Sequence, residues 1–231
     1  MTRSLAPHSP FRDRADAGTQ LASILEPVLA NVDSREIVVV GLARGGVPVA
    51  AEIARALGGP LDACTIRKIR APDQPELALG AVGPRKARVL NQSLIRELRL
   101  VPATVQQLTD RAIAERDRID QVLRGDTAPI SLTDKVVILV DDGLATGASM
   151  RVAIDAVAHQ RPARTIVAVP VAASDVAARF QQVGVDTIVL VKAEHFHAVS
   201  HWYLDFAPVS IATVRHLLST QSDRGSTTYP S

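Results

Sequence analysis

Four short, continuous runs of apolar residues limit the folds that this chain can adopt. Ile37–Leu42, Val136–Val140, Thr165–Val171 and Thr187–Val191 are rich in valine and isoleucine and are too short for buried helices. Continuous apolarity, without alternation of apolar and polar residues, is typical of strands that are buried on both faces. A fifth strand is expected in the mixed segment Leu61–Ile69.

Segments in which apolar residues recur at helical spacing follow three of these runs, at Val47–Leu57, Ser149–His159 and Val176–Val183. Strands that alternate with helices form βαβ units, in which the strands are parallel and the crossovers right-handed. The sequence therefore predicts an α/β fold, a mostly parallel sheet with helices on both faces.

The segment 91–125 interrupts this alternation. Apolar residues recur there at helical spacing between charged residues, and Gly125 is a typical helix end. We predict a helical insertion over residues 91–125. The alternative is a helix that only packs against the edge of the core.

The chain has 231 residues, which fits a single domain over residues 1–231. We expect its core at about 12–192 and a small hood at 193–218. The segments 1–10 and 219–231 are rich in Ser, Thr, Pro and Gly, and are expected to be frayed tails.

Composition excludes several classes of protein. With 47% hydrophobic and 22% charged residues the chain is too apolar for intrinsic disorder, and its formal charge of +2 argues against nucleic acid as a partner. No apolar run approaches the ~18 residues of a membrane span, and the N-terminus lacks the apolar segment of a secretory signal. Cys64 is the only cysteine, so we expect no internal disulfide and a cytoplasmic protein.

The most informative segment is VILVDDGLATGAS, residues 137–149. Four apolar residues end at Asp141 and Asp142, a loop of small residues follows, and a helix is expected from Ser149. In an α/β sheet, ligands bind beyond the carboxyl ends of the strands, where this loop must lie. Exposed backbone N–H groups at a helix N-terminus bind anions, and Thr146 and Ser149 add hydroxyl donors. The loop therefore suits a phosphate.

The two aspartates indicate that the ligand carries more than a phosphate, because carboxylates repel phosphate. A vicinal diol such as that of ribose donates well to carboxylates. The same negative charge would stabilise a sugar carbon that becomes cationic during reaction. The alternative is an ordinary strand that ends in an Asp-Gly turn, but two carboxylates followed by T-G-A-S exceed what a turn requires.

This segment resembles the thirteen-residue motif with which type I phosphoribosyltransferases bind phosphoribosyl pyrophosphate (PRPP), and the match covers all thirteen positions. The resemblance extends over roughly Phe11–Phe206. The stretches GLARGG and WY-x-DF are similar to a less characterised bacterial subgroup of the family. The resemblance implies a glycosyltransferase of nucleotide metabolism that transfers 5-phosphoribosyl from PRPP to a nitrogenous base or similar nucleophile and releases pyrophosphate. It also implies Mg²⁺, held mainly by oxygens of PRPP and by water, with no metal ligand assigned directly to the chain.

The resemblance assigns roles to individual residues. As catalytic residues at the ribose it implies Asp141 and Asp142; for the 5-phosphate it implies Gly143, Leu144, Ala145, Thr146, Gly147, Ala148 and Ser149; for pyrophosphate it implies Ala43, Arg44, Gly45, Gly46, Arg67 and Lys68. The family binds pyrophosphate with a short loop after the first strand, often through a cis peptide bond. The glycines of GLARGG allow a close backbone approach, and Arg44 offers bidentate phosphate binding. Alternatively, this is a tight connection whose Arg44 points to solvent.

A basic run follows the second expected strand. Residues 67–88 contain six Lys and Arg against Asp73 and Glu76, and such a rim would attract pyrophosphate. The family places a mobile loop at this point, for which Ala71–Arg88 is the candidate. A solvated charged loop is the alternative. The insertion 91–125 departs from better-known members and leaves the position of the catalytic loop open.

Two segments are candidates for the hood that selects the base in this family. Phe11–Leu29 is one, and His195–Phe206, with four of the seven aromatic residues, is the other. In the second we assign base binding to Trp202, Tyr203 and Asp205. A hydrophobic lid that closes the core is the alternative.

Two rival functions use the same fold. The chain is either a regulator that binds PRPP or a nucleotide without catalysis, or a degenerate transferase that serves as a structural subunit. A regulator of nucleic acid would need a basic face, but acidic residues interleave with the arginines of the insertion and leave it nearly neutral. The expected partners are PRPP and a small-molecule acceptor of open identity, with a homodimer as the default assembly.

Overall fold

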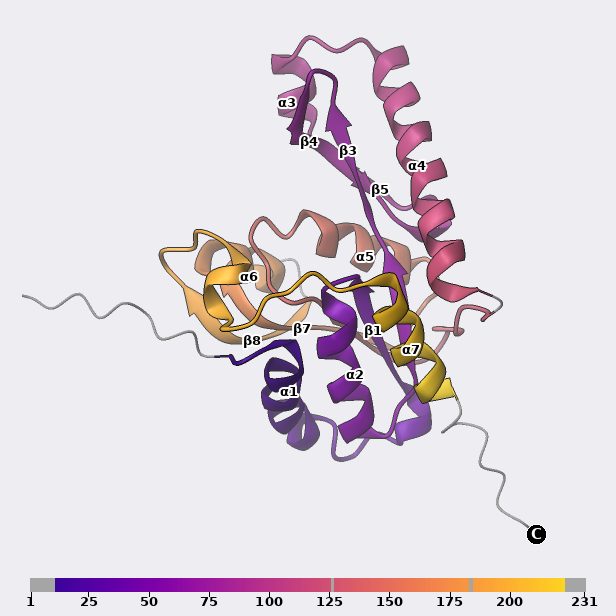
Figure 1. The fold of residues 1–231 in the computed structure, drawn as a ribbon, viewed down its shortest axis with the longest axis vertical. Helices are drawn as coiled ribbons and strands as arrows, with labels where there is room; N and C mark the ends of the chain where they lie inside the picture. The colour runs from indigo at the N-terminus through magenta and orange to yellow at the C-terminus, as the bar shows by residue number, and fades with distance from the viewer. Residues whose placement is uncertain (1–10, 126, 183–184, 223–231) are drawn as a thin grey trace, which may run out of the picture.

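The computed structural model describes residues 11–125, 127–182 and 185–222 (Figure 1). Its elements are, in chain order, α1 (Arg14–Val28), η1 (Ser34–Glu36), β1 (Ile37–Ala43), α2 (Gly46–Leu57), β2 (Leu61–Thr65), β3 (Arg67–Ala71), β4 (Gln74–Val82), η2 (Pro84–Lys86), β5 (Arg88–Leu90), α3 (Gln92–Glu97), α4 (Pro102–Arg124), β6 (Val136–Val140), α5 (Ala148–Ala158), β7 (Arg164–Ala173), α6 (Ser174–Gln182), β8 (Asp186–Ala193), η3 (Val199–Trp202) and α7 (Ile211–Ser222).

The central sheet has five parallel strands in the order β2-β1-β6-β7-β8. The four apolar runs form β1, β6, β7 and β8, and the helical segments after three of them form α2, α5 and α6. The predicted α/β fold with a mostly parallel sheet is therefore confirmed. Val183, the last residue of one predicted helix, lies outside the described residues.

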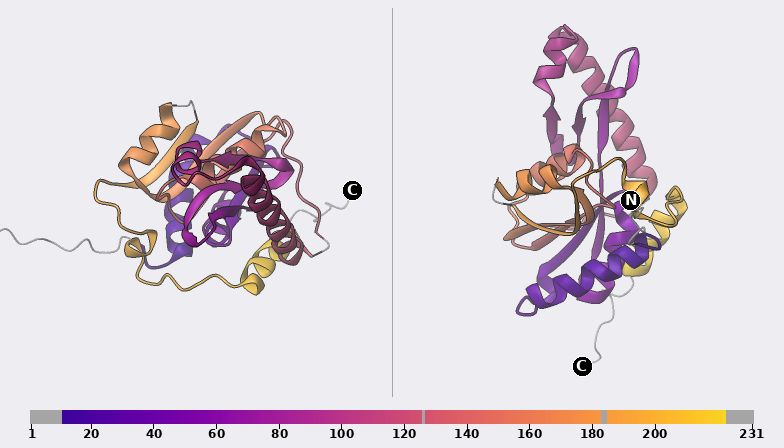
Figure 2. Two further views of the ribbon diagram at one scale, coloured as in Figure 1. Left: turned by 90° about the horizontal axis from the view of Figure 1, so that it is seen from above. Right: turned by 90° about the vertical axis from the view of Figure 1, so that its left-hand side faces the viewer.

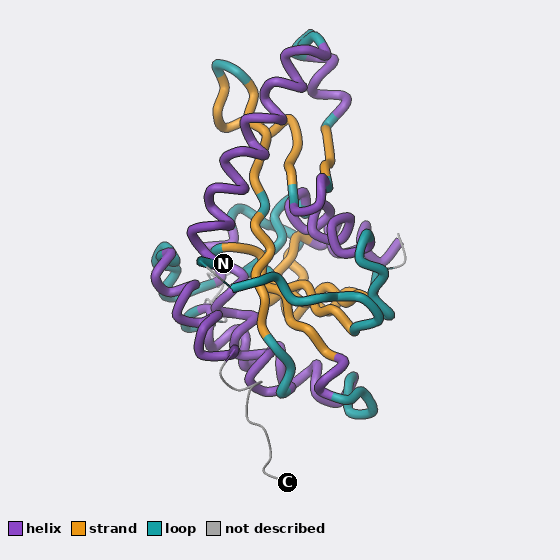
Figure 3. Tube along the Cα trace, turned by 90° about the vertical axis from the view of Figure 1, so that its right-hand side faces the viewer, coloured by secondary structure: helices purple, strands orange, loops and turns teal. Residues whose placement is uncertain are grey.

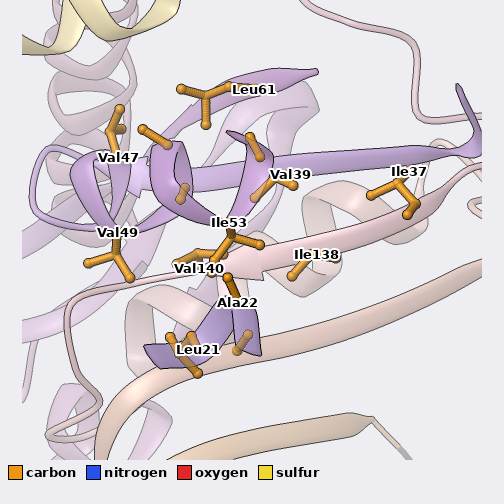
Figure 4. Packing of buried hydrophobic residues seen from close by; sticks show 14 of the residues in the cluster. Leu21, Ala22, Ile37, Val39, Val47, Val49, Ile53, Leu61, Ile138 and Val140 are labelled. Carbon is orange, nitrogen blue, oxygen red and sulfur yellow. The ribbon is translucent and has the colours of Figure 1, made fainter. Parts of the chain in front are cut away.

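The strands are apolar on both faces because both faces are covered by helices (Figure 2). Val39 and Ile138 pack with α1, α2 and α7, whereas their neighbours Val38 and Leu139 pack with α5 and α6. Figure 4 shows the first of these cores, in which Leu21 of α1 lies against the helix α2 and the strands. Successive residues of one strand thus serve two separate cores, which explains the continuous apolar runs.

Residues 67–124 form an arm that extends away from the central sheet (Figures 1 and 3). Strands β3, β4 and β5 pair antiparallel in its own sheet, and α3 and α4 pack on that sheet over a core that includes Ile69, Leu79 and Val105. The longest helix, α4, carries many charges. In the described ranges no helix combines the length and the apolar character that crossing a membrane requires.

The arm corrects three expectations. The segment Leu61–Ile69 is divided between two sheets, because β2 joins the parallel sheet and β3 begins the arm. The insertion predicted at 91–125 covers only the helical half of the arm, which starts near residue 67. Most of Ala71–Arg88, expected as a mobile loop, is strand β4 and the turn after it, held by the arm's own core.

The C-terminal boundaries also change. Helix α7 runs from Ile211 to Ser222, and its Val214 and Leu218 are buried in the same core as Leu61. The hood is therefore restricted to residues 193–210, and the segment 219–222 is helical rather than tail. The remaining tail residues, 1–10 and 223–231, lie outside the described residues.

An ion-pair network that the sequence analysis did not predict joins the arm to the sheet. Arg124, at the end of α4, binds Asp62 of β2 at 2.5 Å and Asp120 at 3.1 Å, and its side chain is only 10% exposed. Asp62 also accepts a hydrogen bond from the backbone N–H of Ile130 at 3.0 Å. Every charged group in this network has a partner, which buried charges require.

Replacement of Asp62 by alanine is expected to destabilise the fold by about 3–5 kcal/mol, because it removes one of the two carboxylates that bind a buried guanidinium. The matched control is Asp186→Ala, which breaks the exposed Arg164–Asp186 pair and should cost about 0–1 kcal/mol. Urea unfolding measures both free energies. Equal losses would contradict the assignment of Arg124 as the anchor of the arm.

Candidate active site

Two loops meet at the carboxyl edge of the sheet, because β1 and β6 are parallel neighbours. A methyl group added at Gly45 would lie 2.1 Å from the Oδ2 atom of Asp142, and one at Gly46 would lie 2.4 Å from the carbonyl oxygen of Val140. Position 46 therefore has no room for a side chain, and a side chain at position 45 would displace the Asp142 carboxylate. The loop after β1 and the acidic residues after β6 form one site.

The loop after β1 contains the residues to which the family resemblance assigns pyrophosphate binding. The Ala43–Arg44 peptide bond is cis. Arg44 is exposed, and Gly46 begins helix α2, so the N-terminus of that helix faces the same edge of the sheet. The exposed guanidinium of Arg44 and the N–H groups at the start of α2 are donors of the kind that bind pyrophosphate.

The loop after β6 offers backbone donors to an anion. Helix α5 begins at Ala148, directly after Gly147, which has the left-handed φ of 71° and lies against Phe180. In the described part of the chain, the backbone N–H groups of Ala145, Thr146 and Gly147 have no hydrogen-bond partner. Together with the helix N-terminus they offer donors of the kind that bind anions.

Leu144 does not belong to the phosphate-binding group that the resemblance implied. Its backbone N–H donates to the carbonyl of Val171 at 2.9 Å, and its carbonyl accepts from Ala173 at 3.0 Å. Its side chain is buried in the core beneath α5. Leu144 therefore anchors the loop to β7 and has no donor left for a ligand.

The acidic pair lies in a largely buried environment. Burial and the neighbouring charge of Asp142 raise the pKa of Asp141 well above its ordinary value. The Asp141 Oδ1 atom accepts the backbone N–H of Asp142 at 2.9 Å. Burial also raises the pKa of Asp142, an effect that the positive charge of Arg14 opposes.

Arg14, in the first turn of α1, is the residue of the site that sequence analysis missed. Its Nε and Nη2 atoms both lie 2.8 Å from the Oδ2 atom of Asp142. The two residues are 128 positions apart, so no local pattern joins them. The only available signal was the interpretation of Phe11–Leu29 as a hood candidate.

The C-terminal hood closes over the acidic pair. The Tyr203 hydroxyl donates to the backbone carbonyl of Asp142 at 2.6 Å, and burial raises the pKa of this hydroxyl. The ring of Tyr203 packs between Phe11 and Phe206, with centroid distances of 5.4 and 5.0 Å. Tyr203 thus acts as the hydrophobic lid and offers no free face for stacking on a base.

The other residues assigned to base or pyrophosphate binding differ in burial and in their partners. Trp202 is half-buried in the same aromatic cluster, and Asp205 is exposed. Arg67 pairs with Glu115 of α4, so its charge is engaged within the arm. Lys68 is exposed on β3. These residues lie outside the two loops that form the centre of the site.

A protein-only metal site is not formed by the described residues, which contain no group of three or more His, Cys, Asp or Glu side chains suited to a metal. The anionic donors at the site are the carboxylates of Asp141 and Asp142. A cation here needs further oxygens from its ligand or from water.

Comparison with known proteins decides the family. The phosphoribosyl transferase domain model matches residues 15–205, which include both loops and the acidic pair. The chain belongs to the phosphoribosyl transferase family. The fold and the family that the thirteen-residue motif predicted are thereby confirmed.

Two relatives from Mycobacterium tuberculosis, strains H37Rv and CDC 1551, are 38% identical over 200 residues and are named only provisionally as phosphoribosyl transferases. The match covers 87% of this chain but 44% of those relatives, so the chain spans less than half of their length. The crystal structure of TT1426 from Thermus thermophilus is 37% identical, with a TM-score of 0.75 over 91% of this chain and 98% of that one. This protein shares nearly the whole architecture.

The acidic pair predicts opposite effects of two similar substitutions on stability. Asp141→Asn is expected to stabilise the fold by about 0.5–2 kcal/mol at pH 7, because it removes a buried charge without an ion-pair partner while retaining an acceptor for the Asp142 N–H. Asp142→Asn is expected to destabilise it by about 1–3 kcal/mol, because Arg14 loses its anionic partner.

Urea unfolding between pH 3 and pH 8 tests the pair. Because the pKa of Asp141 is raised in the folded state, ionisation costs stability as the pH rises above the ordinary value of 3.8. The gain from Asp141→Asn should therefore be present at pH 7 and disappear below pH 3.8. A gain that is independent of pH would show that the charge of Asp141 is not its cause.

Proposed function

We propose that this protein binds PRPP at the carboxyl edge of its sheet and transfers the 5-phosphoribosyl group to a nitrogenous base or similar nucleophile. The observation that carries the proposal is the juxtaposition of Gly45 and Asp142, which joins the two family loops in one site. One loop is suited to a phosphate and the other to a pyrophosphate. The carboxylates of Asp141 and Asp142 lie beside both loops, and they suit the ribose that joins the phosphate to the pyrophosphate in PRPP.

Each part of the site has a chemical role in this reaction. The N–H groups of Ala145, Thr146 and Gly147 and the N-terminus of α5 hold the 5-phosphate, and the loop Arg44–Gly46 receives the pyrophosphate. Asp141 and Asp142 accept hydrogen bonds from the ribose hydroxyls. As the bond between ribose C1 and the pyrophosphate oxygen breaks, its electron pair leaves with pyrophosphate, and the carboxylates stabilise the positive charge on the sugar until the nucleophile bonds to C1.

We further propose that Mg²⁺ is required and is bound mainly through oxygens of PRPP and water. The donor set fits this role, because two carboxylates without further protein ligands suit a hydrated magnesium ion better than a closed metal cage. Asp141 and Asp142 would hold the hydrated ion through water. When bound, the ion neutralises charge on the pyrophosphate.

Calorimetric titration with PRPP, with and without Mg²⁺, tests binding, and a pyrophosphate-release screen over purines, pyrimidines and amines tests transfer. Magnesium-dependent binding together with release in the presence of one acceptor supports the transferase. Binding without release in any arm favours the alternative, a regulator that senses PRPP or a nucleotide. Absence of binding contradicts the assignment of the two loops.

Asp141→Asn and Asp142→Asn are each expected to lower kcat/KM by about ten- to a hundredfold, the equivalent of roughly 1.5–3 kcal/mol for a hydrogen bond to a charged acceptor. Asp175→Asn is the matched control, since it neutralises a carboxylate that is 72% exposed on α6. Pyrophosphate release at varied PRPP concentration measures the effect. Unchanged kcat/KM in the more stable Asp141→Asn variant would refute its role at the ribose.

A further inference from the structure

We propose, on the basis of the proposed function, that Arg14 is a positioning residue that holds Asp142 by one carboxylate oxygen and leaves the other to accept a ribose hydroxyl. The Oδ2 atom of Asp142 receives both Nε and Nη2 of Arg14 at 2.8 Å. Within the described ranges, no other residue donates a hydrogen bond to the Oδ1 atom. One oxygen is therefore committed to the protein and one is available to a ligand.

The guanidinium of Arg14 is itself fixed on three sides. Its Nη1 atom donates to the backbone carbonyl of Ala207 at 2.9 Å, and its Cζ atom lies 3.8 Å from the centre of the Phe206 ring. The Arg14 and Asp142 side chains are only 11% and 14% exposed. A planar group with these contacts has one orientation, which a lysine ammonium cannot reproduce.

The carboxylate of Asp142 is constrained from the opposite side as well. A methyl group on Gly45 would lie 2.1 Å from Oδ2 and 3.3 Å from Oδ1, so the whole carboxylate lies against the loop after β1. The Tyr203 hydroxyl holds the backbone carbonyl of Asp142 at 2.6 Å. Segments from both ends of the described chain thus determine where this carboxylate lies.

Arg14 acts through Asp142 rather than on the substrate. Its N–H groups bind Asp142 and Ala207, and Phe206 covers its face, so the cation is not free to bind a phosphate. The other ionisable groups around Asp142 are Asp141, which repels it, and the Tyr203 hydroxyl. In the loop after β1, Arg44 is exposed. The nearby charge that favours the ionised form of Asp142 is that of Arg14.

A double-mutant cycle tests the proposal. Magnesium-dependent PRPP binding is measured by calorimetry for Arg14→Gln and Arg14→Lys, each alone and combined with Asp142→Asn. Arg14→Gln should weaken PRPP binding roughly ten- to a hundredfold, and Arg14→Lys should weaken it less. In the Asp142→Asn background, Arg14→Gln should change the affinity by no more than about twofold, because its effect requires the carboxylate.

The pH dependence of binding is the readout that a purely structural role would not change. Without Arg14 the pKa of Asp142 rises, so the loss of PRPP affinity on acidification should begin at a higher pH in Arg14→Gln than in the wild type. Arg12→Gln is the matched control: it removes an arginine two residues away whose side chain is 79% exposed, and it should leave the affinity and the pH profile unchanged.

The outcomes separate this inference from the proposed function. A wild-type protein that does not bind PRPP refutes both. If the wild type binds PRPP, unchanged or tighter binding by a folded Arg14→Gln variant overturns this inference but not the proposed function. The inference is also overturned if Arg14→Gln lowers the PRPP affinity as much in the Asp142→Asn background as in the wild type. If Arg14→Gln does not fold, as judged by circular dichroism, the Arg14→Lys cycle decides: wild-type affinity and pH profile in Arg14→Lys overturn the inference.

Discussion

The parallel pairing of β1 with β6 is the constraint on which the site depends. In register, Gly41 of β1 lies beside Val140 of β6, so the loops that follow these strands must leave the sheet side by side. Helices cover both faces of the sheet, so the side chains along its strands are buried and only the residues at the strand ends can contact a ligand. The same pairing brings the N-termini of α2 and α5 to one edge, where both offer backbone donors to anionic groups.

The two carboxylates of the acidic pair are stabilised unevenly by the fold. Asp142 is paired directly with Arg14, whereas Asp141 forms no ion pair among the described residues: the charge of Asp142 repels it, and the Asp142 N–H and the more distant charge of Arg14 compensate in part. A ligand with hydroxyl donors would satisfy both carboxylates. The site therefore carries an electrostatic cost that such a ligand would relieve, and this cost falls mainly on Asp141.

Local patterns in the sequence were sufficient for the sheet and for the two loops, because strand burial and a strand-to-helix loop are encoded by neighbouring residues. Two features depend on long-range contacts and were missed. Arg14 is 128 residues from Asp142, and Arg124 is 62 residues from Asp62. In β3, Ile69 and Ala71 alternate with charged residues, the pattern of a half-buried antiparallel strand, so the segment expected as one strand over Leu61–Ile69 contains the start of a second sheet.

The arm changes how the basic run relates to the site. Its strands hold these residues on a sheet with its own core, and Arg67 is paired with Glu115 across the arm. Arg124 joins the arm to β2, the neighbour of β1. A second contact holds the arm, because its Ala81 and Ala87 pack with Val152 and Ala156 of α5. In this chain, the basic residues of segment 67–88 therefore stand on an arm that a buried ion pair and an apolar contact hold against the central domain.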